Sequence, residues 1–271
     1  MSRNPPGAPG LDGLLSPLRA DPAASAILCD VDGTLAPIVG DPAAAAVPER
    51  TREVLRDLVG GYALVGCLTG RRALEARRIV GVDGITIAGN HGFEVLGPGE
   101  QEPRPDPAVA GRGQRVRAFV EGLEPERLAA VGLRVEDKGA IQALHWRGAP
   151  GEEAAHMRAQ EIATLAQGSG LVPRWGRKVL ELRPIAGIDK GSAALTLLRE
   201  NASAHAVFGG DDLTDLDAFQ ALHWMHSSGR LRSAVCVGVS SPEQPPGLAD
   251  RADFLVEGPE GFRDVLEGLV I

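Results

Sequence analysis

The sequence lacks the features that mark membrane, disulfide-rich and zinc-finger proteins. It contains three cysteines, Cys29, Cys67 and Cys236, whose spacing fits neither a zinc pattern nor a disulfide framework. No apolar run approaches the length of a membrane span, and residues 1–10, rich in Pro and Gly, contain no apolar signal core. We therefore expect a cytoplasmic protein with no membrane partner, in which the cysteines are small core residues.

The charge balance also lacks the excess of basic residues that nucleic-acid binding requires. The 271 residues include 28 Lys and Arg against 36 Asp and Glu, a net charge of −8. We therefore expect no nucleic-acid partner. If the substrate is anionic, its binding needs a metal ion or a few local Lys and Arg side chains.

Apolar runs alternate with helical patterns in the first and last thirds of the chain. This alternation predicts an α/β core, a parallel sheet with helices on its faces. Residues 1–25 are expected to form a loose, flexible lead-in with one short helix near residues 14–19. We expect strands at residues 26–30, 62–68, 85–88, 204–208, 234–239 and 254–256, and helices at residues 48–59, 72–79, 189–200, 214–222 and 261–269.

The pattern changes at residues 97–107, where four prolines and several charges indicate a linker. After it, residues 133–137 with 140–146 and residues 171–175 with 178–182 predict two hairpins. Helices are expected at residues 109–122 and 152–166. We therefore assign residues 26–103 and 187–271 to the core, and residues 104–186 to an inserted, smaller α+β domain.

Several loops of the predicted core place polar residues at one edge of the sheet, because the carboxyl ends of parallel strands meet there. Asp30 and Asp32 follow the first strand. An Asp at such a place can attack phosphorus, and a second Asp can move the proton of the leaving oxygen. The other polar residues expected at this edge are Thr69 with Gly70, Lys190, and Asp211 with Asp212 and Asp215.

Each of these residues also has an ordinary structural explanation. Thr69 could cap a helix, and Lys190 could be a solvated surface lysine. Asp212 and Asp215 could be acids of a first helical turn, favoured by the helix dipole. Two acidic loops would nevertheless repel each other unless a cation neutralised them. A site for Mg²⁺ and a phosphate group is the simplest explanation of the whole set.

Four segments, in this order, resemble the motifs of the haloacid dehalogenase superfamily of phosphatases, whose core is Rossmann-like with three α/β/α layers. The insertion lies where the C2-type cap domains of that superfamily lie. Residues 89–94, 135–139, 143–147 and 176–184 further resemble motifs of the trehalose-6-phosphate phosphatases, and the resemblance extends from about residue 26 to the C-terminus. The four superfamily segments are Asp30-Val31-Asp32-Gly33-Thr34, Leu68-Thr69-Gly70-Arg71, Asp189-Lys190-Gly191 and Gly210-Asp211-Asp212-Leu213-Thr214-Asp215.

The resemblance implies a catalytic or metal-binding role for each matching carboxylate. Asp30 would be the nucleophile and a ligand of Mg²⁺. Asp32 would be the general acid/base, with its main-chain carbonyl on the metal. Asp211 would be the other protein carboxylate on Mg²⁺, supported by Asp212 and Asp215.

The resemblance also implies how the substrate is held. Thr69 and Lys190 would bind the phosphate. The chain departs from the family pattern at Leu68-Thr69, which keeps the hydroxyl of the usual Ile-Ser, and at Phe93, which could change the packing of the sugar-binding loop. The residues expected to contact substrate are Asp30, Val31, Asp32, Gly70, Arg71, His91, Gly92, Glu136, Lys138, Arg147 and Glu181.

The implied activity is Mg²⁺-dependent hydrolysis of trehalose 6-phosphate through an aspartyl-phosphate, by a monomer that takes part in trehalose biosynthesis. One alternative is a phosphatase for another sugar phosphate, such as sucrose 6-phosphate or mannosyl-3-phosphoglycerate. Another is a non-catalytic subunit that binds a phosphosugar, although such a subunit has no need of Asp30. Without the resemblance, the charged residues of the insertion would be read as an exposed cross-strand ladder.

Overall fold

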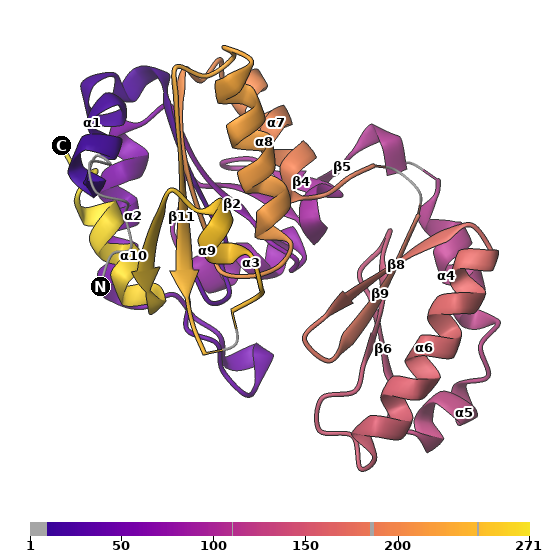
Figure 1. Cartoon of the computed structure of the whole chain (residues 1–271). Helices are drawn as coiled ribbons and strands as arrows, with labels where there is room; N and C mark the ends of the chain where they lie inside the picture. Colours follow the sequence, from indigo (N-terminus) through magenta and orange to yellow (C-terminus); the bar gives the residue numbers. More distant parts are fainter. Residues whose placement is uncertain (1–9, 110, 185–186, 243) are drawn as a thin grey trace. The chain divides into compact units, whose positions relative to one another are not determined.

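The computed structural model describes residues 10–109, 111–184, 187–242 and 244–271, which form two compact units (Figure 1). The core unit comprises the described residues up to Arg104 and from Ile188 onward. The insert unit comprises the described residues from Pro105 to Gly187. Each unit has its own sheet and its own hydrophobic core.

The core unit is built on one mixed sheet. Its strands are β1 (Ser25–Cys29), β2 (Leu64–Leu68), β3 (Thr86–Gly89), β4 (Glu94–Leu96), β5 (Arg104–Pro105), β10 (His205–Gly210), β11 (Ser233–Ser240) and β12 (Phe254–Glu257). They run in the order β12-β11-β10-β1-β2-β3-β4-β5, and all neighbours from β12 to β3 are parallel. Strands β1, β2 and β10 are buried along their whole length, as expected for parallel strands covered on both faces.

Helices cover both faces of this sheet and complete a three-layer α/β/α core, which confirms the predicted fold. Successive residues of β1 point to opposite faces, so Ile27 packs in one hydrophobic cluster and Leu28 in the other. No helix among the described residues has the length and apolar character needed to cross a membrane. One cluster involves α1 (Leu11–Ala20), α2 (Glu49–Gly61), α3 (Ala73–Val80) and α10 (Gly258–Glu267), and the other involves α7 (Lys190–Glu200), α8 (Asp215–Ser227) and α9 (Leu248–Arg251).

At the N-terminus the short helix expected near residues 14–19 is present as α1, but it is packed against the core and is not part of a loose lead-in. Residues 1–9 of the expected lead-in lie outside the described residues, but the part that follows is an ordered part of the core. Leu15 and Leu18 of α1 are buried because their spacing places both on one face of the helix. Arg19 fixes the end of this helix by donating to the main-chain oxygen of Gly268 at 2.9 Å. Strand β4, which pairs antiparallel with β3, was also absent from the prediction.

The insert unit is an antiparallel sheet with helices on one face. Both predicted hairpins are confirmed, and the strand order is β6-β7-β9-β8, with β6 (Arg134–Asp137), β7 (Gln142–His145), β8 (Leu171–Gly176) and β9 (Val179–Pro184). Leu180 and Leu182 of β9 pack in the hydrophobic core with the helices, so Glu181 and Arg183 lie on the opposite face. The helices are α4 (Gly113–Glu121), α5 (Pro125–Ala130), which was not predicted, and α6 (Glu152–Gly168).

Candidate active site

A glycine brings the loops that follow β1 and β10 into direct contact. Gly33 has a φ of +90°, and a Cβ atom at this position would lie 2.3 Å from Oδ2 of Asp211. Only glycine tolerates both the conformation and the close approach. Thr34 Oγ1 donates to Asp211 Oδ1 at 3.4 Å, and the N–H of Asp30 donates to the carbonyl of Gly209 at 2.8 Å. The two acidic loops therefore lie side by side at the carboxyl edge of the sheet.

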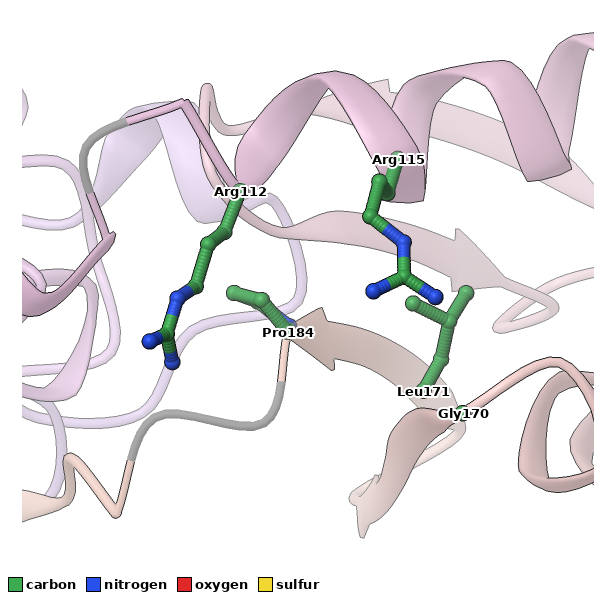
Figure 2. Close-up of a pocket in the computed structure, with 5 residues that line it drawn as sticks. All are labelled: Arg112, Arg115, Gly170, Leu171 and Pro184. Carbon is green, nitrogen blue, oxygen red and sulfur yellow. The ribbon is translucent and has the colours of Figure 1, made fainter.

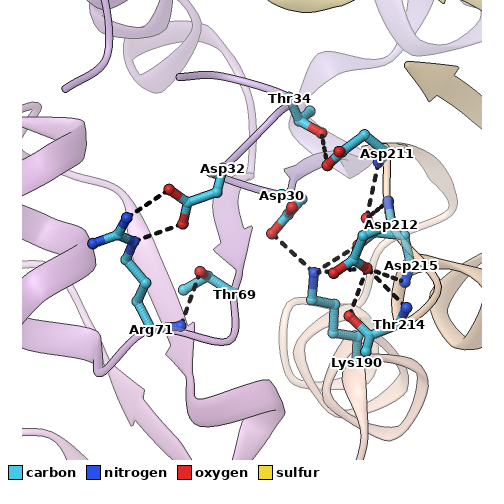
Figure 3. A network of polar contacts seen from close by, with 10 residues as sticks. All are labelled: Asp30, Asp32, Thr34, Thr69, Arg71, Lys190, Asp211, Asp212, Thr214 and Asp215. Carbon is cyan, nitrogen blue, oxygen red and sulfur yellow. Dashed lines mark hydrogen bonds and ion pairs between the residues drawn. The ribbon is translucent and has the colours of Figure 1, made fainter. Parts of the chain in front are cut away.

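Lys190 lies among the carboxylates of these loops (Figure 3). It is the first residue of α7, whose N-terminus is fixed by reciprocal caps between Asp189 and Ser192. Its Nζ donates to Oδ1 of Asp30 at 2.9 Å and to Oδ1 of Asp215 at 2.8 Å. Lys190 is only 2% exposed, so the alternative of a solvated surface lysine is excluded.

Asp215 also organises its own loop. Its Oδ2 accepts the N–H groups of Asp211 and Asp212, each at 2.9 Å. Oδ1 of Asp212 in turn accepts the N–H of Thr214 at 2.8 Å and its hydroxyl at 2.7 Å. A Cβ atom on Gly210 would lie 2.3 Å from Cγ of Asp215, so glycine is required before this loop. The carboxylates of Asp212 and Asp215 are therefore held by main-chain hydrogen bonds.

The cluster holds more negative charge than its lysine balances. Burial raises the pKa of Asp30 to about 8; Lys190 opposes this rise, whereas Asp212 and Asp211 add to it. Burial likewise raises the pKa of the Asp215 carboxyl group. Despite its burial, the surrounding carboxylates raise the pKa of Lys190, which therefore stays protonated. An additional cation at this place would relieve the remaining repulsion.

The same carboxylates have the arrangement of a cation site. Asp30, Asp211 and Asp215 each offer an oxygen atom, and these oxygens lie within 4.8 Å of one another. Carboxylate oxygens are the ligands that Mg²⁺ prefers, and all three residues are buried. The residues present therefore fit a hard divalent cation. Asp215, expected only to support the ligands, stands among the candidate ligands itself.

Asp32 faces a different partner from Asp30. Its carboxylate accepts from Nε of Arg71 at 2.6 Å and from Nη2 at 2.7 Å, a bidentate ion pair. Figure 3 shows the carboxylate of Asp32 directed toward Arg71, whereas that of Asp30 is directed toward Lys190. Asp30 and Asp32, although only two residues apart in the sequence, thus pair with different cationic side chains, Lys190 and Arg71.

The loop after β2 lies beside the turn that follows β3. The main-chain oxygen of Thr69 accepts the N–H of His91 at 2.8 Å, and Thr69 Oγ1 accepts the N–H of Arg71 at 3.2 Å. A Cβ atom on Gly70 would lie 2.8 Å from the imidazole of His91, and one on Gly92 would lie within 2.7 Å of the Ala193 side chain. Glycine is required at position 92, where φ is also +99°, and the lack of a side chain at Gly70 leaves room for the imidazole of His91 next to the predicted phosphate-binding loop.

The insert unit carries a second ion cluster, on the face of its sheet opposite the helices. Glu181 is 6% exposed and accepts from Lys138 Nζ at 3.1 Å through Oε1. Through Oε2 it accepts from Arg183, at 3.1 Å from Nε and 2.6 Å from Nη2. On the same sheet, Glu136 Oε2 pairs with His145 Nε2 at 2.8 Å, and this hydrogen bond lowers the pKa of Glu136. Glu136, Lys138 and Glu181 thus belong to one polar sheet face.

Comparison with family models assigns the chain to a protein family. A family model described as trehalose-phosphatase matches residues 28–245. The chain belongs to the trehalose-phosphatase family. The resemblance carried by the sequence motifs is thereby confirmed.

Individual relatives of this trehalose-phosphatase family member agree with the assignment. A trehalose-phosphate phosphatase of Mycobacterium avium is 36% identical over 168 residues, which cover 58% of this chain and 41% of that protein. The chain therefore spans less than half the length of this curated relative. The crystal structure of a trehalose-6-phosphate phosphatase related protein has a TM-score of 0.66 at 26% identity, covering 89% of this chain and 95% of the other. The C-terminal domain of Candida albicans trehalose-6-phosphate phosphatase has a TM-score of 0.77 at 20% identity, covering 97% of each chain, and shares the fold.

The positions of two predicted substrate contacts, Val31 and Arg147, limit what each can offer to a ligand. Val31 is fully buried in the hydrophobic core, so only its main chain is available to a ligand. Arg147 is exposed beyond the end of β7, and its main-chain oxygen accepts from Arg134 at 3.1 Å. Its role in substrate binding stays a prediction.

Sequence reasoning missed Arg183, which pairs with buried Glu181. The period of two along β9 places these residues on one face, so strand alternation could have identified the pair.

Sequence reasoning also missed a cavity of about 340 Å³ in the insert unit, where Arg112 and Arg115 flank an apolar wall (Figure 2). The residues that line this cavity are Arg112, Arg115, Gly170, Leu171 and Pro184, none of which supplies a nucleophile or a metal ligand for phosphoryl transfer.

Proposed function

We propose that this trehalose-phosphatase family member hydrolyses trehalose 6-phosphate to trehalose and phosphate. The observation that carries the proposal is the placement of buried Asp30 beside Lys190 and close to the carboxylates of Asp211 and Asp215. This arrangement joins a candidate nucleophile to a cation site at the edge where α/β sheets bind ligands. Family membership supplies the sugar phosphate as substrate class.

The first chemical step transfers the phosphoryl group to the protein. An oxygen of Asp30 forms a bond to phosphorus as the bond from phosphorus to the sugar oxygen breaks, and Asp32 gives a proton to that oxygen. Lys190, which lies 2.9 Å from Asp30, and the hydroxyl of Thr69 stabilise charge on the transferring group. When bound by Asp30, Asp211 and the main-chain carbonyl of Asp32, Mg²⁺ would supply further charge stabilisation.

The second step releases phosphate. Asp32 takes a proton from a water molecule, whose oxygen attacks phosphorus and breaks the bond to Asp30. The nucleophile thereby returns as a carboxylate. Because burial raises the pKa of Asp30 to about 8, its ionised form depends on the local positive charge.

The polar sheet face of the insert unit is our proposed sugar-binding surface. Glu136, Lys138 and Glu181 offer both donors and acceptors, which suits the hydroxyl groups of a disaccharide. Their ion pairs hold these side chains in defined positions, which reduces the entropy lost when a ligand binds. His91 and Gly92, beside the loop of Thr69, are proposed to line the sugar side of the core unit.

Phosphate release from three sugar phosphates tests the proposal. With Mg²⁺ present, we expect trehalose 6-phosphate to react with the highest kcat/KM, above sucrose 6-phosphate and mannosyl-3-phosphoglycerate. A preference for either of the other two esters would favour the alternative of a different sugar-phosphate phosphatase. If the protein released phosphate from none of the three esters, the alternative of a non-catalytic phosphosugar-binding subunit would be favoured.

We further propose that the protein acts as a monomer in the cytoplasm. Its three cysteines are buried free thiols, which fits a reducing compartment. Size-exclusion chromatography with light scattering tests the monomer, and a dimer mass would contradict it.

A further inference from the structure

The ion pair between Asp32 and Arg71 engages both carboxylate oxygens of Asp32. Oδ2 accepts from Nε at 2.6 Å and Oδ1 accepts from Nη2 at 2.7 Å. The side chain of Arg71 is 14% exposed and that of Asp32 is 34% exposed, so the arginine is the more deeply buried partner. In Figure 3 the carboxylate of Asp32 is directed toward Arg71, whereas the carboxylate of Asp30 is directed toward Lys190.

Arg71 is itself fixed from several directions. Its Nη1 donates to the carbonyl of Pro42 at 3.0 Å and also pairs with Glu75. Its main-chain oxygen accepts the N–H of Asn90 at 2.7 Å. The guanidinium group is therefore a positioned partner for Asp32, unlike a mobile surface arginine.

Proton transfer requires a different orientation of Asp32. During the reaction its carboxyl group must reach the oxygen that leaves phosphorus, and later the attacking water. In the observed orientation both of its oxygens are bound to Arg71. The ion pair must therefore open in each turnover. An ester whose binding does not stabilise the open state reacts only with the small open population, so its apparent rate is reduced.

We propose that Arg71 is a specificity-determining residue that holds Asp32 out of the reaction until a sugar phosphate binds. This inference rests on the proposed function. Binding energy from parts of the substrate remote from phosphorus is used to open the pair. A small phosphate ester lacks those parts, so it reacts only with the minor open population. Arg71 thus acts through Asp32 on the choice between large and small esters.

Arg71→Gln tests this inference with trehalose 6-phosphate and 2-glycerophosphate, each assayed with Mg²⁺. Both esters have alkoxide leaving groups, so both need the proton from Asp32. We expect kcat/KM for 2-glycerophosphate to rise about threefold to tenfold, because the open population increases. The value for trehalose 6-phosphate is expected to stay level or fall. Arg71→Lys, which cannot form the bidentate pair, should show a smaller rise in the same direction.

Two controls separate this role from a structural one. Arg72→Gln, at the exposed neighbouring position, should leave the ratio between the two esters unchanged. In an Asp32→Asn background, Arg71→Gln should no longer raise the 2-glycerophosphate rate, because the effect requires the Asp32 carboxylate.

A parallel loss on both esters in Arg71→Gln and Arg71→Lys would overturn the inference and make Arg71 a phosphate-binding or structural residue. A wild-type protein active on 2-glycerophosphate but not on trehalose 6-phosphate would refute the proposed substrate alone, and the rise on 2-glycerophosphate would still decide the role of Arg71. A wild-type protein inactive on both esters would refute the function and the inference together.

Discussion

The two units each bury an ion cluster, but the two clusters have opposite charge balance. In the core unit, Lys190 lies among Asp30, Asp211 and Asp215, so carboxylates outnumber the lysine. In the insert unit, the single carboxylate of Glu181 is paired with both Lys138 and Arg183.

This difference distinguishes a carboxylate-rich cluster that offers candidate cation ligands from a cluster whose carboxylate is already paired with two cationic side chains. Burial raises the pKa of Asp30 and Asp215, Lys190 opposes this rise, and the neighbouring carboxylates add to it, so a further cation such as Mg²⁺ would be favoured here. The cluster of the insert unit instead stabilises its own sheet and presents polar groups at fixed positions. Chemistry is thus expected in the core unit, and recognition of the sugar in the insert unit.

The largest effect is expected for Asp30→Asn. Turnover of trehalose 6-phosphate should fall by at least about 10⁴-fold, because the amide cannot attack phosphorus. The thermal midpoint of the metal-free protein should stay level or rise, since one crowded carboxylate is removed. Steady-state kinetics and calorimetry check both parts. A variant that keeps near-normal turnover would show that Asp30 is not the nucleophile.

Lys190→Met should destabilise the metal-free core unit by about 3–5 kcal/mol, because it leaves buried carboxylates without their cation. Urea denaturation in the presence of a chelator measures this loss. Saturating Mg²⁺ should restore part of the stability. An unchanged midpoint would show that Lys190 does not stabilise the carboxyl groups around it.

Glu181→Gln should destabilise the insert unit by about 3 kcal/mol, since Lys138 and Arg183 lose their counter-charge. Glu136→Gln is a matched control on the same sheet. Its partner His145 is partly exposed, so we expect less than about 1 kcal/mol. Hydrogen exchange of residues 105–187 separates this unit from the rest. Equal effects of the two substitutions would contradict the importance of the buried cluster.

The pH dependence of the unfolding free energy should also distinguish the core cluster, which contains a carboxyl group of raised pKa, from the cluster of the insert unit. Between its ordinary value of 3.8 and about 8, Asp30 holds a proton in the folded state that the unfolded chain has released. The unfolding free energy of the metal-free protein should therefore fall as pH rises, by roughly 2 kcal/mol from pH 6 to pH 7.5. Asp30→Asn should reduce this slope, while Asp215, whose pKa burial also raises, keeps its own contribution. Mg²⁺ should oppose the slope because the metal binds the ionised form. A slope unaffected by either change would rule out Asp30 as its source.

The order of the loops made much of the core site predictable. Buried strands such as β1 have continuous apolar sequences, and parallel strands bring Asp30 and Asp211 to one edge although they lie far apart in the chain. The partnership of Asp32 with Arg71 was not predictable, because it depends on side-chain orientation across two loops. Likewise, the burial of α1 depends on tertiary packing of Leu15 and Leu18, which outweighs the loop-like composition around them.

The central claim is that Asp30 receives the phosphoryl group, and Asp32→Asn with p-nitrophenyl phosphate tests it most directly. Nitrophenolate leaves without a proton, so this variant should still form the aspartyl-phosphate, but its hydrolysis should be slow because it needs the base. We predict a single-turnover burst of nitrophenolate and, by mass spectrometry after an acid quench, one phosphoryl group on Asp30. Steady turnover without a burst, or a phosphoryl group on another residue, would contradict the account.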